Sequence, residues 1–381
     1  MLEKLILHNF KSNKSTELHF DHSRLHGLVG KNSAGKTSVL QALHYLSMIA
    51  NTSPEKIFEH DKSPQFITTV GEQNMYVHAS GFLKNESRTK WEVSYTWNKE
   101  NTNNWNPALS WNIDGKEGNW TKEKVLFGLY PMPYPTGKFN FLNPTVYLKL
   151  IASNLAKAAY SEEITPRVEF DGSLLAPTLD FLRDEAPDKF QLIEEKLSRI
   201  VPNVRKVGIK RAKVPVIRKR LIEVDGKSIS YEETQEMTGQ EVVLDMNTGE
   251  RIPAHAISEG TMLTLGLLTV LMNPNQPNLV LLDDVEQGLH PEAQRELMNV
   301  FKEIIAENPN LQIIFSTHSP YIIDALTPSQ VHILNNSKSG FTIAKRLDEH
   351  PDVEWAKETL TTGEFWDAEG EDWVVEGEIS D

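Results

Sequence analysis

The sequence predicts an α/β fold built on a mostly parallel sheet, with an antiparallel β lobe and an insertion of helices and strands. Three observations support this prediction. A short apolar strand at residues 25–29 runs into a glycine-containing loop and then into a helical pattern. Short strand patterns follow at residues 66–113, and apolar strands alternate with helices after residue 250. Such alternation is typical of parallel sheets, whereas consecutive short strands form antiparallel meanders.

The individual elements are predicted from hydrophobic periodicity and from turn residues. We expect strands at residues 2–10, 17–20, 25–29, 66–70, 75–82, 91–97, 109–113, 204–224, 228–245, 279–282 and 311–316. We expect helices at residues 39–49, 145–159, 174–200, 259–272, 291–306 and 320–325, and a proline-rich loop at residues 131–144. Five of the eight tryptophans fall between residues 91 and 120. Packing of the meander is the favoured interpretation, and a platform for nucleobases is the alternative.

The composition limits the chemistry. The chain has no cysteine, which excludes disulfides, thiol catalysis and cysteine-ligated zinc or iron–sulfur sites. The net charge of −14 is uneven, because residues 346–381 carry 13 acidic and two basic side chains, a net of −11, and the first 345 residues carry −3. The negative net charge therefore does not exclude binding of nucleic acid by the first 345 residues. Residues 1–6 lack a signal-peptide pattern and the longest near-apolar run, residues 262–272, is too short for a bilayer, so we expect a soluble, cytoplasmic protein.

A phosphate-binding loop is predicted after the strand at residues 25–29. Residues 30–37 read G-K-N-S-A-G-K-T and fit the pattern G-x-x-x-x-G-K-[ST] at every fixed position. Glycines let the backbone curl so that its N–H groups meet phosphate oxygens, and the helix N-terminus adds its positive end. Lys36 would reach the β- and γ-phosphates of ATP, and Thr37 would offer its hydroxyl to Mg²⁺. The candidate nucleotide-binding residues of this loop are Gly30, Lys31, Asn32, Ser33, Ala34, Gly35, Lys36, Thr37 and Ser38.

Acidic residues follow the apolar strand at residues 279–282, and ligands of open α/β sheets bind outside the carboxyl ends of such strands. Asp283 would hold Mg²⁺ opposite Thr37, as a Walker B carboxylate does. Asp284 is placed to orient or polarise the attacking water. Glu286 lies on the same side of the chain as Asp284 if the chain stays extended. His318 ends the next apolar strand, where an imidazole can bond a γ-phosphate or position water. An acidic surface turn and a structural histidine are the alternatives.

These motifs place a nucleotide-binding core on both sides of an insertion. Residues 1–120 contain the phosphate loop and the β lobe, and residues 251–345 contain the acidic residues and the histidine. Residues 121–250 form the insertion, with a helical arm and basic strands. Residues 346–381 form an acidic tail that contains aromatic residues.

The motifs together resemble the ATPase heads of ABC and SMC-type proteins. The nearest resemblance is to the AAA15/AAA21 group, which includes the ATPase parts of OLD-family nucleases and several antiphage systems. Besides the phosphate loop, the resemblance rests on residues 5–12 and on three further motifs. Residues 257–261 are similar to a degenerate ABC signature, and residues 281–291 are similar to a Walker B strand with its D-loop. Residues 316–320 are similar to a switch-histidine segment. It covers most of residues 1–340.

The resemblance implies a homodimer in which two heads meet head to tail, with higher oligomers left open. Each ATP would lie between the phosphate loop of one head and the signature of the other, so that Ser258 and Gly260 touch the γ-phosphate across the interface. A turn that caps the following helix is the alternative for these two residues. The sequence departs from the family at Glu259, where no glycine pair is present, and at Asp284, which replaces the usual catalytic glutamate. Hydrolysis is therefore expected to be slow, or to involve Glu286.

Two charged regions are candidates for partner binding. Residues 203–222 contain no acid and eight basic residues, namely Arg205, Lys206, Lys210, Arg211, Lys213, Arg218, Lys219 and Arg220. This pattern fits either a solvated hairpin or a surface for DNA or RNA phosphates. In the tail, acids are interleaved with Phe365, Trp366 and Trp373. The tail fits either a docking peptide for a separately encoded effector or a segment folded back on its own chain.

We therefore expect an ATPase that acts as a dimeric switch or sensor and regulates a separately encoded effector, a nuclease or toxin, in antiphage defence. The defence role is an analogy at the level of the family. A DNA repair or recombination ATPase is one alternative, and a nucleotide-binding scaffold that holds an effector inactive with little turnover is another. The insertion shows no sustained heptads and is too short for the arms of SMC proteins, whereas transporter heads lack such an insertion.

Overall fold

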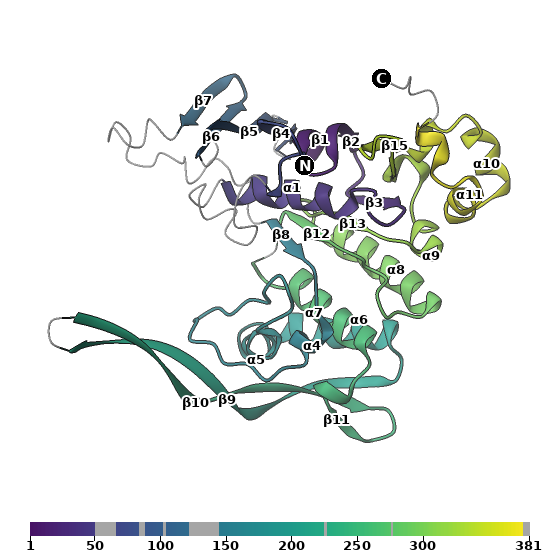
Figure 1. Cartoon of the computed structure of the whole chain (residues 1–381). Helices are drawn as coiled ribbons and strands as arrows, with labels where there is room; N and C mark the ends of the chain where they lie inside the picture. The colour runs from purple at the N-terminus through teal and green to yellow at the C-terminus, as the bar shows by residue number, and fades with distance from the viewer. Residues whose placement is uncertain are drawn as a thin grey trace. The chain divides into compact units, whose positions relative to one another are not determined.

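The computed structural model describes residues 1–49, 66–83, 88–101, 104–121, 145–224, 227–275 and 277–375. The chain forms two compact units (Figure 1). Unit 1 comprises Met1–Tyr147, Pro277–Glu286 and Phe301–Asp381, and unit 2 comprises Leu148–Gln276 and Gln287–Val300. The four segments expected from the sequence remain a prediction, and the proline-rich loop at residues 131–144 lies outside the described residues.

Unit 1 contains a mixed, mostly parallel sheet in the order β15-β14-β3-β13-β12-β8. Its strands are β3 (Leu25–Gly30), β8 (Thr145–Leu148), β12 (Leu279–Leu282), β13 (Gln312–Ser316), β14 (Val331–Asn336) and β15 (Thr342–Arg346). β3 pairs in parallel with β13 and β14, β13 pairs in parallel with β12, and β14 is antiparallel to β15. Every residue of β3, β12 and β13 is buried, which explains why central parallel strands read as apolar runs. Helix α1 (Lys36–Ile49) follows β3, and the short α9 (Pro320–Ile323) follows β13.

The second sheet of unit 1 is the antiparallel β lobe, in the order β2-β1-β4-β5-β6-β7. Its strands are β1 (Leu2–Phe10), β2 (Asn13–His19), β4 (Asn74–Phe82), β5 (Lys90–Asn101), β6 (Asn104–Ile113) and β7 (Lys116–Thr121). The core between this sheet and α1 includes the buried side chains of Phe10, Tyr95, Trp91 and Trp97. The packing interpretation is therefore confirmed for these two tryptophans, whereas the side chains of Trp105 and Trp120 lie outside the described residues.

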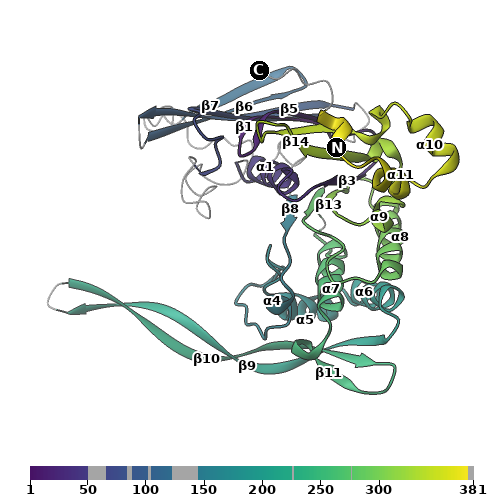
Figure 2. The ribbon, with the colours of Figure 1, turned by 45° about the vertical axis from the view of Figure 1, so that its right-hand side comes forward.

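Unit 2 combines helices with a long β ribbon. Its helices are α4 (Ala152–Leu155), α5 (Leu175–Glu185), α6 (Pro187–Ile200), the 3₁₀ helix η2 (Ala254–Ala256), α7 (Glu259–Leu271) and the first part of α8 (Pro291–Glu307). Its sheet has the order β11-β10-β9, with β9 (Val204–Val224), β10 (Lys227–Met246) and β11 (Arg251–Pro253). Figure 2 shows β9 and β10 running side by side beyond these helices as a two-stranded ribbon.

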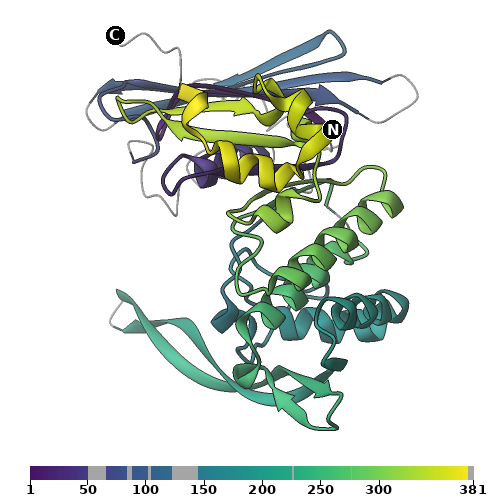
Figure 3. The same ribbon diagram turned by 90° about the vertical axis from the view of Figure 1, so that its right-hand side faces the viewer.

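The acidic C-terminal segment is folded onto unit 1. It contains the 3₁₀ helices η4 (Leu347–Glu349) and η5 (Asp372–Val375) and the helices α10 (Val353–Thr359) and α11 (Thr362–Glu369), and the 3₁₀ helix η3 (Pro328–Gln330) precedes it. Phe365, Trp366 and Val374 are buried, α11 contacts α9, and η5 contacts β14 and β15. In Figure 3 this segment, in yellow, lies beside the yellow-green strands of the sheet. The folded-back alternative is thus correct up to residue 375, and the docking peptide is wrong for these buried aromatic residues.

Several secondary-structure predictions were wrong or incomplete. Residues 174–200, predicted as one helix, form the two helices α5 and α6. Residues 66–70, predicted as a strand, make only an isolated bridge from Phe10 to Thr68, and Val70 is 98% exposed. Residues 145–159, predicted as a helix, contain β8 and the four-residue helix α4, because apolar spacing in so short a run does not separate helix from strand. Strands β14 and β15 were not predicted, although they pair beside the phosphate-loop strand.

Candidate nucleotide site

The predicted phosphate loop has a backbone that requires its glycines. The loop joins β3 to α1, and φ is 144° at Gly30, 66° at Ser33 and 101° at Gly35. A Cβ at Gly30 would lie 2.1 Å from the carbonyl oxygen of Leu334, and a Cβ at Gly35 would lie 2.5 Å from Oγ1 of Thr342. No side chain fits at these two positions. A loop that curls in this way before a helix N-terminus forms an anion site.

Lys36 places a cation inside this loop. Its side chain is buried, and Nζ donates to the carbonyl oxygens of Gly30 at 2.8 Å and of Lys31 at 3.2 Å. Burial lowers the pKa of Lys36, and the nearby carboxylates of Asp284 and Asp283 oppose that effect. A buried ammonium bonded to neutral carbonyls can transfer those hydrogen bonds to phosphate oxygens, which carry more negative charge.

Thr37 and Asp283 meet as the sequence predicts. Thr37 Oγ1 lies 3.1 Å and 3.0 Å from the two carboxylate oxygens of Asp283. A hydroxyl and a carboxylate supply the oxygen ligands that Mg²⁺ takes beside phosphates and water, so these residues fit the ion. Ser316, which was not predicted, donates from Oγ to Asp283 Oδ1 at 2.7 Å. The sequence signal that could have revealed it is a hydroxyl at the carboxyl end of a strand neighbouring the Asp283 strand.

The remaining candidate catalytic residues lie at the ends of two adjacent strands. Asp284 is exposed, with φ at 54°, so the chain turns there and does not stay extended as was assumed for Glu286. Glu286 instead points back, and its Oε1 accepts the backbone N–H of His318 at 2.7 Å. His318 itself is exposed, directly beyond the end of β13. β12 and β13 pair in parallel, which is why acids and histidine from separate motifs come together.

Two family models match the chain. The model AAA_15, "AAA ATPase domain", matches residues 1–104, and the model AAA_21, "AAA domain, putative AbiEii toxin, Type IV TA system", matches residues 155–324. The chain belongs to the AAA15/AAA21 ATPases. The two models cover the phosphate loop, the signature, Asp283, Asp284, Glu286 and His318.

Two curated proteins are similar to this AAA15/AAA21 ATPase. The "Retron Vc95 probable ATPase" of Vibrio cholerae is 29% identical over 153 residues, which is 38% of this chain and 29% of that protein. The match therefore spans less than a third of the retron protein. An "ATP/GTP phosphatase" of Helicobacter pylori is 23% identical over 349 residues, which is 86% of this chain and 87% of that protein.

Solved structures confirm the fold of an ABC/SMC-type ATPase head. An SMC head bound to the C-terminal winged-helix domain of ScpA matches with a TM-score of 0.53 and 15% identity, covering 91% of this chain and 98% of that one. An SMC head with an extended coiled coil, bound to the C-terminal domain of ScpA and derived from Pyrococcus furiosus, matches with a TM-score of 0.54 and 13% identity, covering 94% and 98%. Among the described residues, no helix has the length and apolarity needed to cross a membrane.

The predicted signature, residues 257–261, lies in unit 2, at the start of α7. Ser258 is its exposed N-cap residue, and the Ser258 hydroxyl lies 2.7 Å from Thr261 Oγ1. Gly260 is buried, and a Cβ there would lie 2.2 Å from the carbonyl oxygen of Gly288. Close packing within unit 2 is thus sufficient reason for glycine at position 260, whereas the γ-phosphate contact of Ser258 and Gly260 remains a prediction.

Acids within unit 2 pair with part of the basic strand β9. Four of its eight cations form ion pairs: Lys210 with Glu241 at 3.2 Å, Lys213 with Glu236 at 2.9 Å, Arg220 with Glu233 at 2.6 Å, and Arg218 with Glu162. Three of these acids come from β10, which pairs with β9 along its whole length. This pairing favours the solvated hairpin over a surface for nucleic acid.

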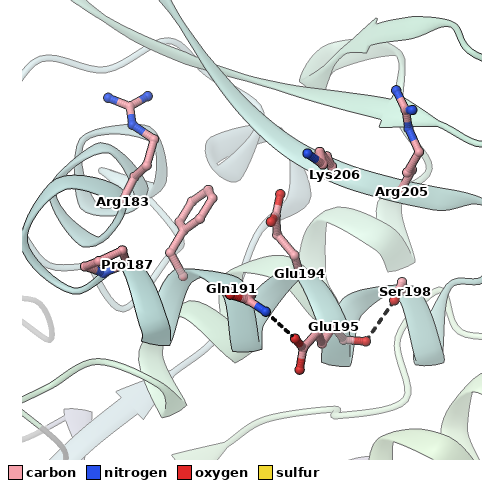
Figure 4. A pocket seen from close by; sticks show the side chains of 9 residues that line it. Arg183, Pro187, Gln191, Glu194, Glu195, Ser198, Arg205 and Lys206 are labelled. Atoms are coloured by element: carbon pink, nitrogen blue, oxygen red, sulfur yellow. Dashed lines mark hydrogen bonds between the residues drawn. The ribbon is translucent and has the colours of Figure 1, made fainter.

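A groove of about 460 Å³ lies in the same unit, between α6, the end of α5 and β9 (Figure 4). Arg183, Arg205 and Lys206 line it together with Glu194 and Glu195. Arg183 is paired with aspartates of its own helix and Glu194 accepts the backbone N–H of Val207, so these charges already serve the fold of unit 2.

The C-terminal segment reaches the phosphate loop of unit 1. Lys31 Nζ lies 2.7 Å from Asp372 Oδ1, which lowers the pKa of Asp372 and raises that of Lys31. Asn335 on β14 holds the segment by donating to the carbonyl oxygen of Glu371 at 2.9 Å and to Asp372 at 3.2 Å. Sequence reasoning missed this contact, because nothing in either motif identifies the other.

Proposed function

We propose that this AAA15/AAA21 ATPase is a dimeric, ATP-dependent switch that regulates a separately encoded effector, a nuclease or toxin, in antiphage defence. The observation that carries the proposal is the junction of Thr37 and Asp283 below the phosphate loop, with Asp284 and His318 at the ends of adjacent strands. Such an arrangement can hold a nucleoside triphosphate and attack its terminal phosphate.

Each residue has a role in the proposed reaction. Lys36 neutralises charge on the β- and γ-phosphates, and Thr37 and Asp283 would hold Mg²⁺, which would withdraw charge from the phosphate oxygens. Asp284 orients the attacking water. Glu286 orients His318 through its backbone N–H, so that the imidazole can face the γ-phosphate. Because aspartate is one methylene shorter than the glutamate usual in this role, turnover is slow.

The proposed dimer and the proposed effector are supported by different observations. In the resembled heads, ATP joins two copies, and here Ser258 is exposed at the N-terminus of α7, where it can meet the γ-phosphate of a second copy. The effector and the defence role are supported by the relatives, since one is named as a retron ATPase and one family description names a toxin. The effector would dock on the acidic surface of α10 and α11, outside their buried aromatic residues.

The dimer is tested by sedimentation velocity with ATP and Mg²⁺. Asp284→Asn should bind ATP and accumulate as a dimer, because hydrolysis no longer separates the heads. Lys36→Ala should lose nucleotide affinity and remain a monomer, whereas Ser258→Arg should bind ATP and remain a monomer. A nucleotide-saturated Asp284→Asn variant that stays monomeric would overturn the dimeric switch, and retained nucleotide affinity in Lys36→Ala would overturn the phosphate-loop assignment.

The effector is tested by purifying the chain together with the products of its neighbouring genes. A stable complex that survives size-exclusion chromatography and contains a nuclease or toxin is expected. If the chain elutes alone with and without ATP, regulation of a separately encoded effector is wrong.

A further inference from the structure

Ser316 is a buried serine whose hydroxyl joins both acids of the neighbouring strand. It is the last residue of β13, and its side chain is 0% exposed. Its Oγ donates to Asp283 Oδ1 at 2.7 Å and accepts the backbone N–H of Asp284 at 2.8 Å. None of the motifs that carry the family resemblance assigns a role to this hydroxyl.

The hydrogen-bonding capacity of the serine explains the arrangement. A hydroxyl has one proton to donate and two lone pairs to accept. The Ser316 proton goes to the carboxylate of Asp283, and a lone pair receives the N–H of Asp284. Thr37 approaches the same carboxylate from α1, so the Asp283 side chain is held from two elements and its rotation is restricted.

The second bond holds the backbone where it is strained. Asp284 has φ at 54°, a left-handed conformation that costs free energy in a residue other than glycine. The Ser316 hydroxyl satisfies the N–H of that residue and thereby holds the turn that takes the Asp284 side chain out of the strand. One buried hydroxyl thus bonds both the carboxylate of Asp283 and the backbone of Asp284.

We propose that Ser316 is a positioning residue for the Mg²⁺–nucleotide complex. It orients Asp283 toward the ion and holds the backbone of Asp284 in the turn. The inference rests on the proposed function, since it assumes that Asp283 holds the ion. Ser316 acts through these two acids. Loss of a hydrogen bond that orients a metal ligand typically weakens metal affinity by about 10–100-fold.

The test uses Mn²⁺ as the probe, because its binding to the protein–nucleotide complex can be followed by electron paramagnetic resonance without turnover. In the full chain with a non-hydrolysable ATP analogue, Ser316→Ala should raise the Kd for Mn²⁺ about tenfold. Affinity for the analogue in EDTA should stay within twofold of the unchanged protein, because Lys36 and the loop backbone are untouched. Ser316→Thr, which keeps the hydroxyl, should restore Mn²⁺ affinity.

A matched control removes a serine hydroxyl elsewhere in unit 1. Ser47 is also buried, and its Oγ donates to the carbonyl oxygen of His44 within α1. Ser47→Ala should leave the Kd for Mn²⁺ unchanged. If Ser316→Ala does not fold, Ser316→Cys carries the test, because a thiol is a weak donor of similar shape and should weaken Mn²⁺ binding in the same direction.

The outcomes separate the two proposals. Mn²⁺ affinity unchanged in folded Ser316→Ala or Ser316→Cys overturns the positioning role while leaving the nucleotide site intact. Failure of the proposed function looks different, since Lys36→Ala and Asp283→Ala would then leave nucleotide and Mn²⁺ binding unaffected.

Discussion

Asp284 and Glu286 lie two residues apart in the sequence but have different surroundings. Asp284 is exposed in a strained turn beyond a buried strand, whereas one oxygen of Glu286 is occupied by the backbone N–H of His318. Strained residues held by surrounding structure are typical of functional sites. The geometry therefore favours Asp284 as the acid that meets water and Glu286 as a support for the histidine segment.

The two acids are distinguished by substitutions that remove charge and keep size. Asp284→Asn should lower kcat by at least about 100-fold, the scale of a lost general base, with nucleotide affinity within a few-fold of the unchanged protein. Glu286→Gln should lower kcat less, because the Gln oxygen can still accept the His318 N–H. Phosphate release at saturating ATP gives kcat. A larger loss in Glu286→Gln than in Asp284→Asn would reverse the two roles.

His26 makes the stability of unit 1 depend on pH. Burial lowers its pKa to about 4 from an ordinary value of 6.5, against the opposing charge of Asp21, and the adjacent His332 is also shifted downward by burial. As pH falls below 6.5, His26 becomes protonated in the unfolded chain, whereas the buried imidazole stays neutral in the folded chain. The stability contribution of His26 is therefore present above pH 6.5 and is lost as pH falls toward 4.

Between pH 7 and pH 4 this loss should amount to about 3 kcal/mol from His26 alone. Urea unfolding at both pH values measures it. His26→Gln should show a smaller decrease in the free energy of unfolding over this range, since an amide can still donate to the carbonyl oxygen of Ser23, as Nε2 does. The exposed His22→Gln controls for the substitution. If the free energy of unfolding of His26→Gln decreased between pH 7 and pH 4 as much as that of the unchanged protein, His26 would not be the source of the pH dependence.

At the scale of elements, α11 anchors the acidic segment to unit 1 through its buried side chains. Thr361 caps this helix, its Oγ1 accepting the backbone N–H of Glu364, and Phe365 is 1% exposed. Most charged residues of the segment are exposed, whereas Val353, Phe365 and Trp366 are buried and Trp355 is exposed. Charge composition describes the outer face only, which is why the sequence left the folded-back segment and the docking peptide as equal alternatives.

Phe365→Ala should destabilise the folded chain by about 3–5 kcal/mol, as expected for truncating a buried aromatic residue. The matched control is Trp355→Ala on α10, where the side chain is 58% exposed, and little change in Tm is expected there. Thermal unfolding followed by circular dichroism measures both. Equal shifts in Tm for the two variants would mean that the segment does not pack as described.

The motif-bearing strands were the most predictable elements. Residues 279–282 and 313–315 are apolar on both faces, which identifies central strands, and the loop after residue 29 fits a pattern with fixed glycines. β8 was missed because Thr145–Leu148 is too short for periodicity to separate strand from helix. The pairing of β14 with β3 depends on contacts between distant residues, which local patterns do not contain.

For the whole molecule, sequence motifs predicted the candidate residues of the nucleotide site but not the atoms that these residues contact. Thr37 and Asp283 were expected to meet, and they do. Glu286 was expected on the same side as Asp284 only if the chain stays extended, but the backbone turns at Asp284 and Glu286 accepts the backbone N–H of His318. Ser316 had no assigned role, because its partners lie on a neighbouring strand.

The contact between Lys31 and Asp372 has a consequence for regulation, because linkage between two sites is reciprocal. A ligand that draws Lys31 away from Asp372 makes the C-terminal segment easier to displace. A protein that displaces this segment must, by the same factor, change the affinity of the loop for that ligand. An exposed ion pair contributes little by itself, so such coupling would be graded and would follow nucleotide concentration continuously.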